Sequence, residues 1–263
     1  MIFEVKHTET VQHILGNWDK TFIWSCLQGI MGKIYVTDTD KPGSAMAVLG
    51  DFIFYAGEPD EELVSWKQGW QKPDFAIMAP QHKGWEPLIE QTYGNKAKAI
   101  SRYAVKKERG IFDRKTLRQA VSALSGEYSL CFIDERLYQL CRSEPWSSDL
   151  VSQYKDYNEY KALGLGVVIV KNGKPVSGAS SYSRYKEGIE IEIDTKEAYR
   201  RKGFAYICGA ELILECLKRG LYPSWDAHNK ASLALAEKLG YHFSHEYRAY
   251  EISICPSGKY GQQ

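Results

Sequence analysis

Apolar and polar positions alternate most regularly between residues 188 and 195. Isoleucines at 189, 191 and 193 alternate there with Glu190, Glu192 and Asp194. A period of two predicts a β-strand with one apolar face and one carboxylate face. Just before it, the apolar run 164–170, the pair Asn172-Gly173 and the run 175–182 predict a β-hairpin.

A helical spacing of apolar residues follows in residues 203–219. Its stripe comprises Phe204, Ile207, Cys208, Leu214 and Leu217. The ending Lys218-Arg219-Gly220 is typical of a helix C-terminus, where cations and a left-handed glycine are favoured. A strand at 222–226, a helix at 229–239 and a strand at 241–247 complete this half.

The first half gives the same order of elements. Residues 7–29 have helical spacing, and three short β-like runs follow at 33–37, 45–49 and 52–55. The remaining elements are a helix at 61–67, a strand at 75–78, a helix at 86–93 and a strand at 97–106. Both halves read helix–strand–strand–strand–helix–strand–helix–strand, which predicts a mixed α/β protein of two tandem units.

The charged segment 106–114 is the candidate boundary between these units. It predicts one domain over residues 1–115 and a second over residues 116–263. A surface turn within a single domain explains the same segment equally well.

Charge and cysteine content narrow the cellular setting. The 263 residues carry a net charge of +1, so no overall field favours nucleic acid or an acidic membrane as a partner. The six cysteines have no metal-ligand spacing, and we expect no metal site. Free thiols, the lack of a leader pattern and the lack of a long apolar run predict a soluble, cytoplasmic protein.

The segment 199–205 (YRRKGFA) is the first candidate for chemistry. Three cations precede a helix whose first N–H groups have no intrahelical partner. Gly203 allows a ligand to approach the backbone closely, and the small Ala205 leaves the same face open. These features predict a pyrophosphate site. The alternative is a solvated basic helix start that binds nothing.

Two other features are weaker indications of a site. A strand covered on both faces should be apolar throughout, so the carboxylates of 188–195 predict either a solvent-exposed face or a polar cleft beside the pyrophosphate site. Asn229 and Ser232 begin the last helix, but Asn229 is also a good N-cap, which explains its presence without a ligand.

Together these segments resemble the GNAT acetyltransferase superfamily over about residues 164–247. The motifs are R-R-K-G-F-A at 200–205, N-K-A-S at 229–232 and E-K-L-G-Y at 237–241, in the family's order and spacing. The resemblance implies a mixed, mostly antiparallel sheet flanked by helices, in which acetyl-coenzyme A (acetyl-CoA) is the acyl donor. Residues 1–115 lack the motif, so the first unit would be GNAT-like without cofactor binding.

The residues that the resemblance places on the cofactor form three groups. The pyrophosphate would be bound by Arg200, Arg201, Lys202, Gly203, Phe204 and Ala205. The pantetheine arm would pair with the main chain of Ile193 and Thr195. Asn229 and Ser232 would contact that arm from its other side.

The implied reaction passes the acetyl group directly to a primary amine on a small molecule. An amine with a pKa of about 10.4 must lose a proton before it attacks. Glu192 is the first candidate for the general base and Glu190 the second. Many family members have a Tyr that protonates the leaving thiolate where this chain has Ala236; Tyr241 and Tyr206 are the candidate replacements.

Several alternatives stay open. The layout is similar to a bacterial GNAT branch that includes acetyltransferases giving resistance to zwittermicin-like aminopolyol antibiotics. Ala236 modestly favours a non-catalytic acyl-CoA-binding or interaction module. A Fem-type tandem protein, which takes aminoacyl groups from transfer RNA, is disfavoured by the near-zero charge and the intact R-x-x-G-x-A. An oligomer is compatible with the sequence.

Overall fold

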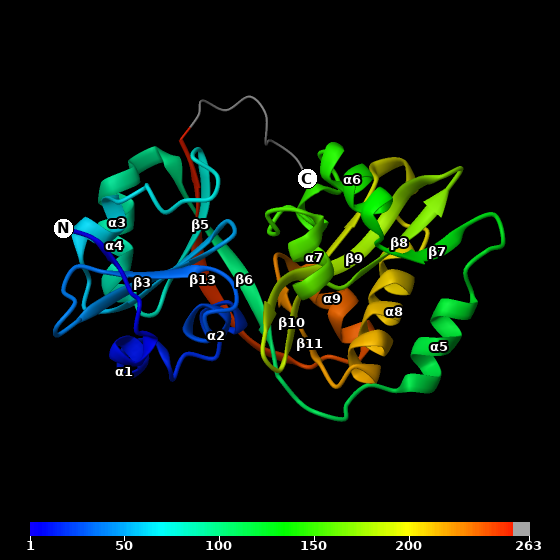
Figure 1. The fold of residues 1–263 in the computed structure, drawn as a ribbon, viewed down its shortest axis with the longest axis horizontal. Coiled ribbons are helices and arrows are strands. Elements are labelled where there is room, and N and C mark those ends of the chain that lie inside the picture. The colour runs from blue at the N-terminus through cyan, green and yellow to red at the C-terminus, as the bar shows by residue number, and fades with distance from the viewer. Residues whose placement is uncertain (255–263) are drawn as a thin grey trace. The chain divides into compact units, whose positions relative to one another are not determined.

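Two units divide the chain, and the computed structural model describes residues 1–254 of it (Figure 1). Unit 1 consists of residues 1–102 and the segment from Glu246 onward, and unit 2 of residues 103–245. Residue 115, the predicted boundary, lies within unit 2, because helix α5 (Arg114–Ser122) packs on helix α8 (Phe204–Lys218). Cys255 and the remainder of the predicted second domain lie outside the described residues.

Unit 1 is built on a sheet with the strand order β1-β2-β3-β4-β5-β13-β6. β4 and β5 pair in parallel, whereas β1/β2, β2/β3, β3/β4 and β5/β13 pair antiparallel. The strands are β1 (Phe3–Glu4), β2 (Lys33–Val36), β3 (Ser44–Leu49), β4 (Phe52–Gly57), β5 (Phe75–Pro80), β6 (Ala97–Val105) and β13 (Phe243–Ser253). β6 and β13 also carry the chain into and out of unit 2.

The helices of unit 1 are short. They are α1 (Gln12–Leu15), α2 (Thr21–Leu27), α3 (Glu61–Ser65) and α4 (Glu86–Tyr93), with 3₁₀ turns η1 (Thr8–Val11), η2 (Lys83–Trp85) and η3 (Gly94–Lys96). The single helix expected over residues 7–29 is wrong. A turn separates α1 from α2 at residues 16–20, where Gly16, Asn17 and Asp19 favour turn conformations.

Unit 2 is built on a five-stranded sheet with the order β11-β10-β9-β8-β7. Its strands are β7 (Ser129–Phe132), β8 (Gly166–Lys171), β9 (Lys174–Tyr185), β10 (Gly188–Thr195) and β11 (Tyr222–Ser224), and the short β12 (Asp226–Ala227) pairs with the end of β6. Its other helices are α6 (Glu135–Ser143), α7 (Tyr157–Leu163) and α9 (Lys230–Leu239), with η4 (Ser148–Leu150) and η5 (Glu197–Tyr199). β10 pairs antiparallel with β9 and parallel with β11.

Helices cover both faces of this sheet (Figure 1). α5 and α8 lie together on one face, and α6 and η4 pack against β9 and β10 on the other. The isoleucines of β10 belong to one core with residues of α8, including Ile207 and Cys208. The alternation in the sequence therefore predicted correctly which face of β10 is apolar.

Most of the expected elements are present. The order helix–strand–strand–strand–helix–strand–helix–strand is present from α2 to β6 and, apart from the short β12, from α7 to β13. The predicted hairpin turn is confirmed by the positive φ values of Asn172 (51°) and Gly173 (75°), which a two-residue type I′ turn requires. Strand β7 was not predicted, because this edge strand is partly exposed on both faces and has no regular alternation.

The five described cysteines are free thiols. Within residues 1–254 no helix is long and apolar enough to cross a membrane. No group of His, Cys, Asp or Glu suited to a metal ion occurs in that range either.

The close approach of β10 and β11 at Gly188 gives a testable prediction. A Cβ at Gly188 would lie 2.1 Å from the Tyr222 carbonyl oxygen, so the two strands would have to move apart. We expect Gly188→Ala to lower the free energy of unfolding by about 1–3 kcal/mol, as overpacking does. Urea denaturation measures this change. Gly126→Ala is the matched control, because a Cβ there meets no described atom within 4 Å; equal effects of the two substitutions would contradict the packing argument.

Candidate functional site

The site begins where β10 and β11 diverge. Their parallel register runs from Gly188↔Tyr222 to Glu190↔Ser224 and stops there. Beyond this point β10 continues beside β9, whereas the chain after β11 turns to pair with β6 through Asp226 and Ala227. The main chain of β10 from Ile191 to Thr195 therefore lies past the end of its neighbour, and an extended ligand can pair with such a strand edge.

The N-terminus of α8 supplies the second component. The first hydrogen bond of the helix runs from the Ile207 N–H to the Gly203 carbonyl, 3.2 Å away. The N–H groups of Phe204, Ala205 and Tyr206 consequently have no acceptor within the helix. The capping residue Gly203 contributes no side-chain hydrogen bond, so these donors and the positive end of the helix dipole face outward.

The backbone of the preceding loop holds this helix start open. Gly203 has φ 81° and Arg201 φ 62°, both in the left-handed region. A Cβ at Gly203 would meet no described atom within 4 Å, so the space beside the helix start is open. A left-handed conformation is unusual for arginine. It reverses the chain between the end of β10 and α8, and the reversal places Arg200, Arg201 and Lys202 at the helix start, where all three are exposed.

Side-chain contacts fix the two ends of the loop. Arg200 Nε donates to the Thr195 carbonyl at 3.2 Å. The Lys202 ammonium lies 5.2 Å from the centre of the Tyr199 ring. Phe204, the first helical residue, is buried against Tyr128, with ring centres 4.7 Å apart. Arg200 and Lys202 are thus held at the predicted anion site, Arg200 by a main-chain carbonyl and Lys202 by an aromatic ring.

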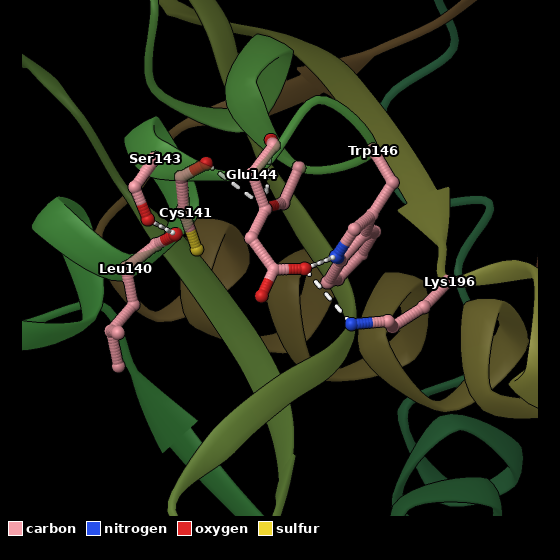
Figure 2. A network of polar contacts seen from close by, with 7 residues as sticks. Leu140, Cys141, Ser143, Glu144, Trp146 and Lys196 are labelled. Carbon is pink, nitrogen blue, oxygen red and sulfur yellow. Dashed lines mark hydrogen bonds and ion pairs between the residues drawn. The ribbon is translucent and has the colours of Figure 1, made fainter.

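A polar network connects the end of β10 to the turn after α6. Figure 2 shows the Glu144 carboxylate between the Trp146 indole N–H and the Lys196 ammonium, and both distances are 2.9 Å. The Lys196 ammonium, followed by Trp146, lowers the pKa of the Glu144 carboxyl. Because both ionic side chains are 40% exposed, this pair contributes little to stability. The ion pair does hold the side chain of Lys196, the first residue after β10, where the chain begins its path to Arg200, Arg201 and Lys202.

Local hydrogen bonds engage Asn229 and Ser232. Asn229 Oδ1 accepts from the Ser232 N–H at 2.9 Å, which makes Asn229 the N-cap of α9. Ser232 Oγ accepts from the indole of Trp225 at 3.1 Å, and Trp225 lies between β11 and β12. Asn229 therefore has the N-cap role that explains its presence without a ligand. The Asn229 amide nitrogen and the Ser232 hydroxyl can in addition donate hydrogen bonds to a ligand.

The carboxylates of β10 are not a solvent-exposed face. Glu190 is only 3% exposed, and Glu192 and Asp194 are partly buried. η4 packs on this part of the sheet, and the charge of Asp149 acts on Asp194. Burial raises the pKa of the Asp194 carboxyl, against the opposing effects of the Thr195 N–H and of Arg200. Carboxyl groups whose pKa is shifted by burial are frequent at functional sites.

The candidate replacements for the missing tyrosine differ in their surroundings. Ala236 is fully buried, and its methyl side chain cannot donate a proton. The Tyr241 hydroxyl donates to the Pro223 carbonyl at 2.6 Å, and burial raises its pKa well above 10. Tyr206 is partly exposed on the first turn of α8, with the Lys238 ammonium 4.5 Å from its ring centre. Tyr206 is thus the better placed of the two to exchange a proton.

The corresponding segment of unit 1 has the opposite character. β4 and β5 stay paired up to Tyr55↔Pro80, and the Gln81 N–H then donates to the Tyr55 carbonyl at 2.8 Å. The five-residue helix α3 is capped by the Asp60 carboxylate, and Glu61 and Glu62 follow in its first turn. The carboxylates at that helix start would repel an anion.

Sequence reasoning missed the buried hydroxyl groups of β9. Ser177, Ser180, Ser181 and Ser183 are all fully buried beside the strand that carries the carboxylates. The missed signal was the serine-rich run of the second hairpin strand, which was interpreted only as β-structure. Sequence reasoning also missed the Glu144–Lys196 ion pair, because its two residues are far apart in the sequence.

The raised pKa of Asp194 gives a prediction about stability and pH. The unfolded carboxyl titrates near 3.9 and the folded one at a higher pH, so stability falls as the pH rises through this window and stays lower above it. Asp194→Asn should therefore raise the melting temperature at pH 7, and the gain should vanish below about pH 4. Thermal unfolding at both pH values measures it.

Asp113→Asn is the control of opposite sign. Hydrogen bonds from the Thr116 hydroxyl and from the Lys115 and Thr116 N–H groups lower the pKa of the Asp113 carboxyl, which stabilises the fold above the unfolded pKa and is lost as the pH falls. This substitution should lower the melting temperature at pH 7. A loss of stability at pH 7 in Asp194→Asn would contradict the assigned cost of burial.

Comparisons with known proteins agree with this geometry. The family model described as GNAT acetyltransferase matches residues 12–250. An uncharacterized N-acetyltransferase, YdfB, of Bacillus subtilis (strain 168) is 27% identical over 248 residues, which cover 88% of this chain and 89% of that protein. The crystal structure of a GCN5-related N-acetyltransferase-like protein from Streptococcus suis 89/1591 has 46% identity and a TM-score of 0.89, covering 94% of this chain and 98% of the other.

A tandem arrangement has a structural parallel. A tandem GNAT protein from the clavulanic acid biosynthesis pathway has a TM-score of 0.56 at 9% identity, covering 98% of this chain and 99% of that one, and so shares the fold. With a family model that spans nearly all of the described residues, the chain belongs to the GNAT acetyltransferase family, as an enzyme of the N-acetyltransferase class.

Proposed function

We propose that unit 2 transfers an acetyl group from acetyl-CoA directly to a primary amine on a small molecule. The observation that carries this proposal is the conjunction of a strand edge beyond Glu190↔Ser224 with an uncapped helix start behind three cations. The first suits an extended amide-containing arm, and the second suits a pyrophosphate.

The residues of the site fit the donor group by group. Arg200, Arg201 and Lys202 supply charge, and the N–H groups of Gly203, Phe204 and Ala205 supply donors for the pyrophosphate oxygens. Ile193 and Thr195 offer main-chain groups to the pantetheine amides. Asn229 and Ser232, at the start of α9, are assigned to the other side of that arm. The open space at Gly203 supports this assignment, because a side chain there would occupy the anion's position.

A carboxylate of β10 accepts the proton of the acceptor amine. An ammonium group with a pKa of about 10.4 is almost entirely protonated at pH 7, so attack requires a base. Glu190 lies at the last strand pair, and Glu192 lies two residues further along the diverging part. These buried and partly buried carboxylates also attract a cationic acceptor, which supports an amine as the substrate.

Departure of the thiolate needs only modest help. A thiol with a pKa of about 8.5 is a good leaving group without a strong acid. This supports catalysis in spite of Ala236 and weakens the case for a module that only binds acyl-CoA. Tyr206 is the candidate that returns a proton to the sulfur.

Unit 1 has a supporting role in this proposal. Its paired strands and acidic helix start argue against a second donor site, so one chain would bind one acetyl-CoA. The aminopolyol-resistance branch and the cytoplasmic location stay predictions.

The role of the two glutamates gives a testable prediction. Glu190→Gln should lower kcat by about 10²–10⁴-fold at pH 7, because the amide cannot accept the proton. Glu192→Gln should have a smaller effect on kcat and a larger one on the KM of the amine, if it mainly attracts the acceptor. Thiol release from acetyl-CoA with glucosamine, lysine and 1,4-diaminobutane measures both.

Binding of acetyl-CoA is the internal control for both variants. Its dissociation constant should be unchanged, since neither side chain is assigned to the donor. Full kcat in the Glu190→Gln and Glu192→Gln double variant would contradict base catalysis from β10. Unaltered donor binding without transfer to any amine by the wild type would contradict the proposed acetyl transfer.

A further inference from the structure

A further cation lies near the start of α8, outside the loop that carries Arg200, Arg201 and Lys202. The ammonium of Lys171, the last residue of β8, is 5.0 Å from the centre of the Tyr128 ring. The same ring packs edge-on against Phe204, the first residue of α8, with ring centres 4.7 Å apart. A single aromatic ring therefore separates Lys171 from the helix start, although β9 and β10 lie between them in the sequence.

Lys202 approaches the same aromatic rings from the loop. Its ammonium is 5.2 Å from the centre of the Tyr199 ring, and the centres of the Tyr199 and Tyr128 rings are 6.5 Å apart. Lys171 and Lys202 thus lie over neighbouring rings. We call these two lysines the lysine corner.

Both lysines of the corner act on one carboxylate. Glu127 Oε2 accepts from the Lys171 ammonium at 2.9 Å. This hydrogen bond is the main cause that lowers the pKa of the Glu127 carboxyl, and the charge of Lys202 acts in the same direction. Because the Glu127 side chain is 56% exposed and that of Lys171 is 29% exposed, the ion pair is weak and an anion from solvent can replace the carboxylate.

A phosphate monoester is a better partner for two lysines than a carboxylate. It carries a charge of about −1.5 to −2 at pH 7 and has three strong acceptor oxygens. A carboxylate carries a single negative charge, and charge-assisted hydrogen bonds strengthen with the charge of the acceptor group. The corner therefore favours a phosphate monoester over its own Glu127.

Acetyl-CoA has one phosphate monoester, on the 3′ oxygen of its ribose, in addition to the pyrophosphate. In the sheet order β11-β10-β9-β8-β7, strand β8 lies on the opposite side of β10 from β11. The proposed edge for the pantetheine arm faces β11. A donor whose pyrophosphate lies at the start of α8 can therefore extend its adenosine toward β8, where Lys171 is located.

We propose that Lys171 and Lys202 bind the 3′-phosphate of acetyl-CoA, which displaces Glu127 from Lys171. The displacement exchanges one ion pair for another and forms no covalent bond. The enzyme then selects free CoA thioesters over donors that lack this phosphate, such as acyl groups on the phosphopantetheine arm of a carrier protein. This inference rests on the proposed acetyl transfer and specifies its donor.

The test compares acetyl-CoA with acetyl-3′-dephospho-CoA, which differs only in the missing phosphate. By calorimetric titration the wild type should bind acetyl-CoA about 3- to 10-fold more tightly. Lys171→Met should lower this preference about 2- to 5-fold by weakening acetyl-CoA alone. Its kcat with glucosamine, lysine or 1,4-diaminobutane should be unchanged, and the KM of acetyl-CoA should rise.

Glu127→Gln tests the displacement, because it removes the competing carboxylate and leaves both lysines in place. Its preference for acetyl-CoA should rise about 2- to 3-fold, which is the opposite direction from Lys171→Met. Lys218→Met is the matched control. Lys218 pairs with Glu215 at 3.3 Å at the other end of α8, so the substitution removes a similar ion pair without changing the preference. All three melting temperatures should stay near that of the wild type, since these pairs are exposed.

A crystal structure with CoA gives a readout that does not depend on activity. The 3′-phosphate should lie between the ammonium groups of Lys171 and Lys202, and the Glu127 carboxylate should have left Lys171. A 3′-phosphate that contacts neither lysine would overturn the inference.

The outcomes separate this inference from the proposed function. Equal affinity of the wild type for the two donors overturns the 3′-phosphate site alone, and so does equal weakening of both donors by Lys171→Met. In both cases acetyl transfer from acetyl-CoA still supports the proposed function. If neither donor binds to the wild type, the proposed function fails, and the 3′-phosphate site fails with it.

Discussion

The site depends on one parallel strand pair that ends early. β10 and β11 are in register over three residue pairs, and after Glu190↔Ser224 each strand continues beside a different neighbour. Pairing with β9 keeps β10 extended, so its free edge is rigid when a ligand arrives, and a pre-formed edge lowers the entropy cost of binding. The same strand then ends in the loop that leads to α8. A single strand thus connects the buried Glu190, the strand edge that we propose for the donor arm and the helix start that we propose for the pyrophosphate.

The two units show how one order of elements gives different results. In unit 1 the equivalent strands stay paired, and the helix start is closed by the Asp60 carboxylate. In unit 2 a left-handed glycine without a side chain replaces that cap, and three cations precede it. Under the proposed function, the electrostatic sign of the helix start and the length of the strand pairing decide which unit binds the donor. The fold, which both units share, does not decide it.

Local chemistry made parts of this structure predictable. The alternation in 188–195, the Asn172-Gly173 turn and the loop 200–205 depend on neighbours in the sequence, and each was interpreted correctly as structure. The break in residues 7–29 and edge strand β7 were missed, because turn residues and an exposed edge override periodicity. The pairing of Glu190 with Ser183 and Ser224 and the Glu144–Lys196 ion pair both join segments that are distant in the sequence. The sequence suggested Glu192 before Glu190 as the general base, and that order stays a prediction. The register adds only that Glu190 lies at the last pair of β10 with β11 and that Glu192 lies beyond it.

The most direct test of the account is calorimetric titration of acetyl-CoA into the wild type, Gly203→Glu and Gly220→Glu. Both glycines have positive φ, lie at opposite ends of α8 and have open space where a Cβ would be, so backbone strain and added charge are matched. The account predicts one site per chain in the wild type, retained in Gly220→Glu and lost in Gly203→Glu, where a carboxylate meets the pyrophosphate. Equal binding by both variants, or no binding by the wild type, would contradict an acetyl-CoA site at the start of α8.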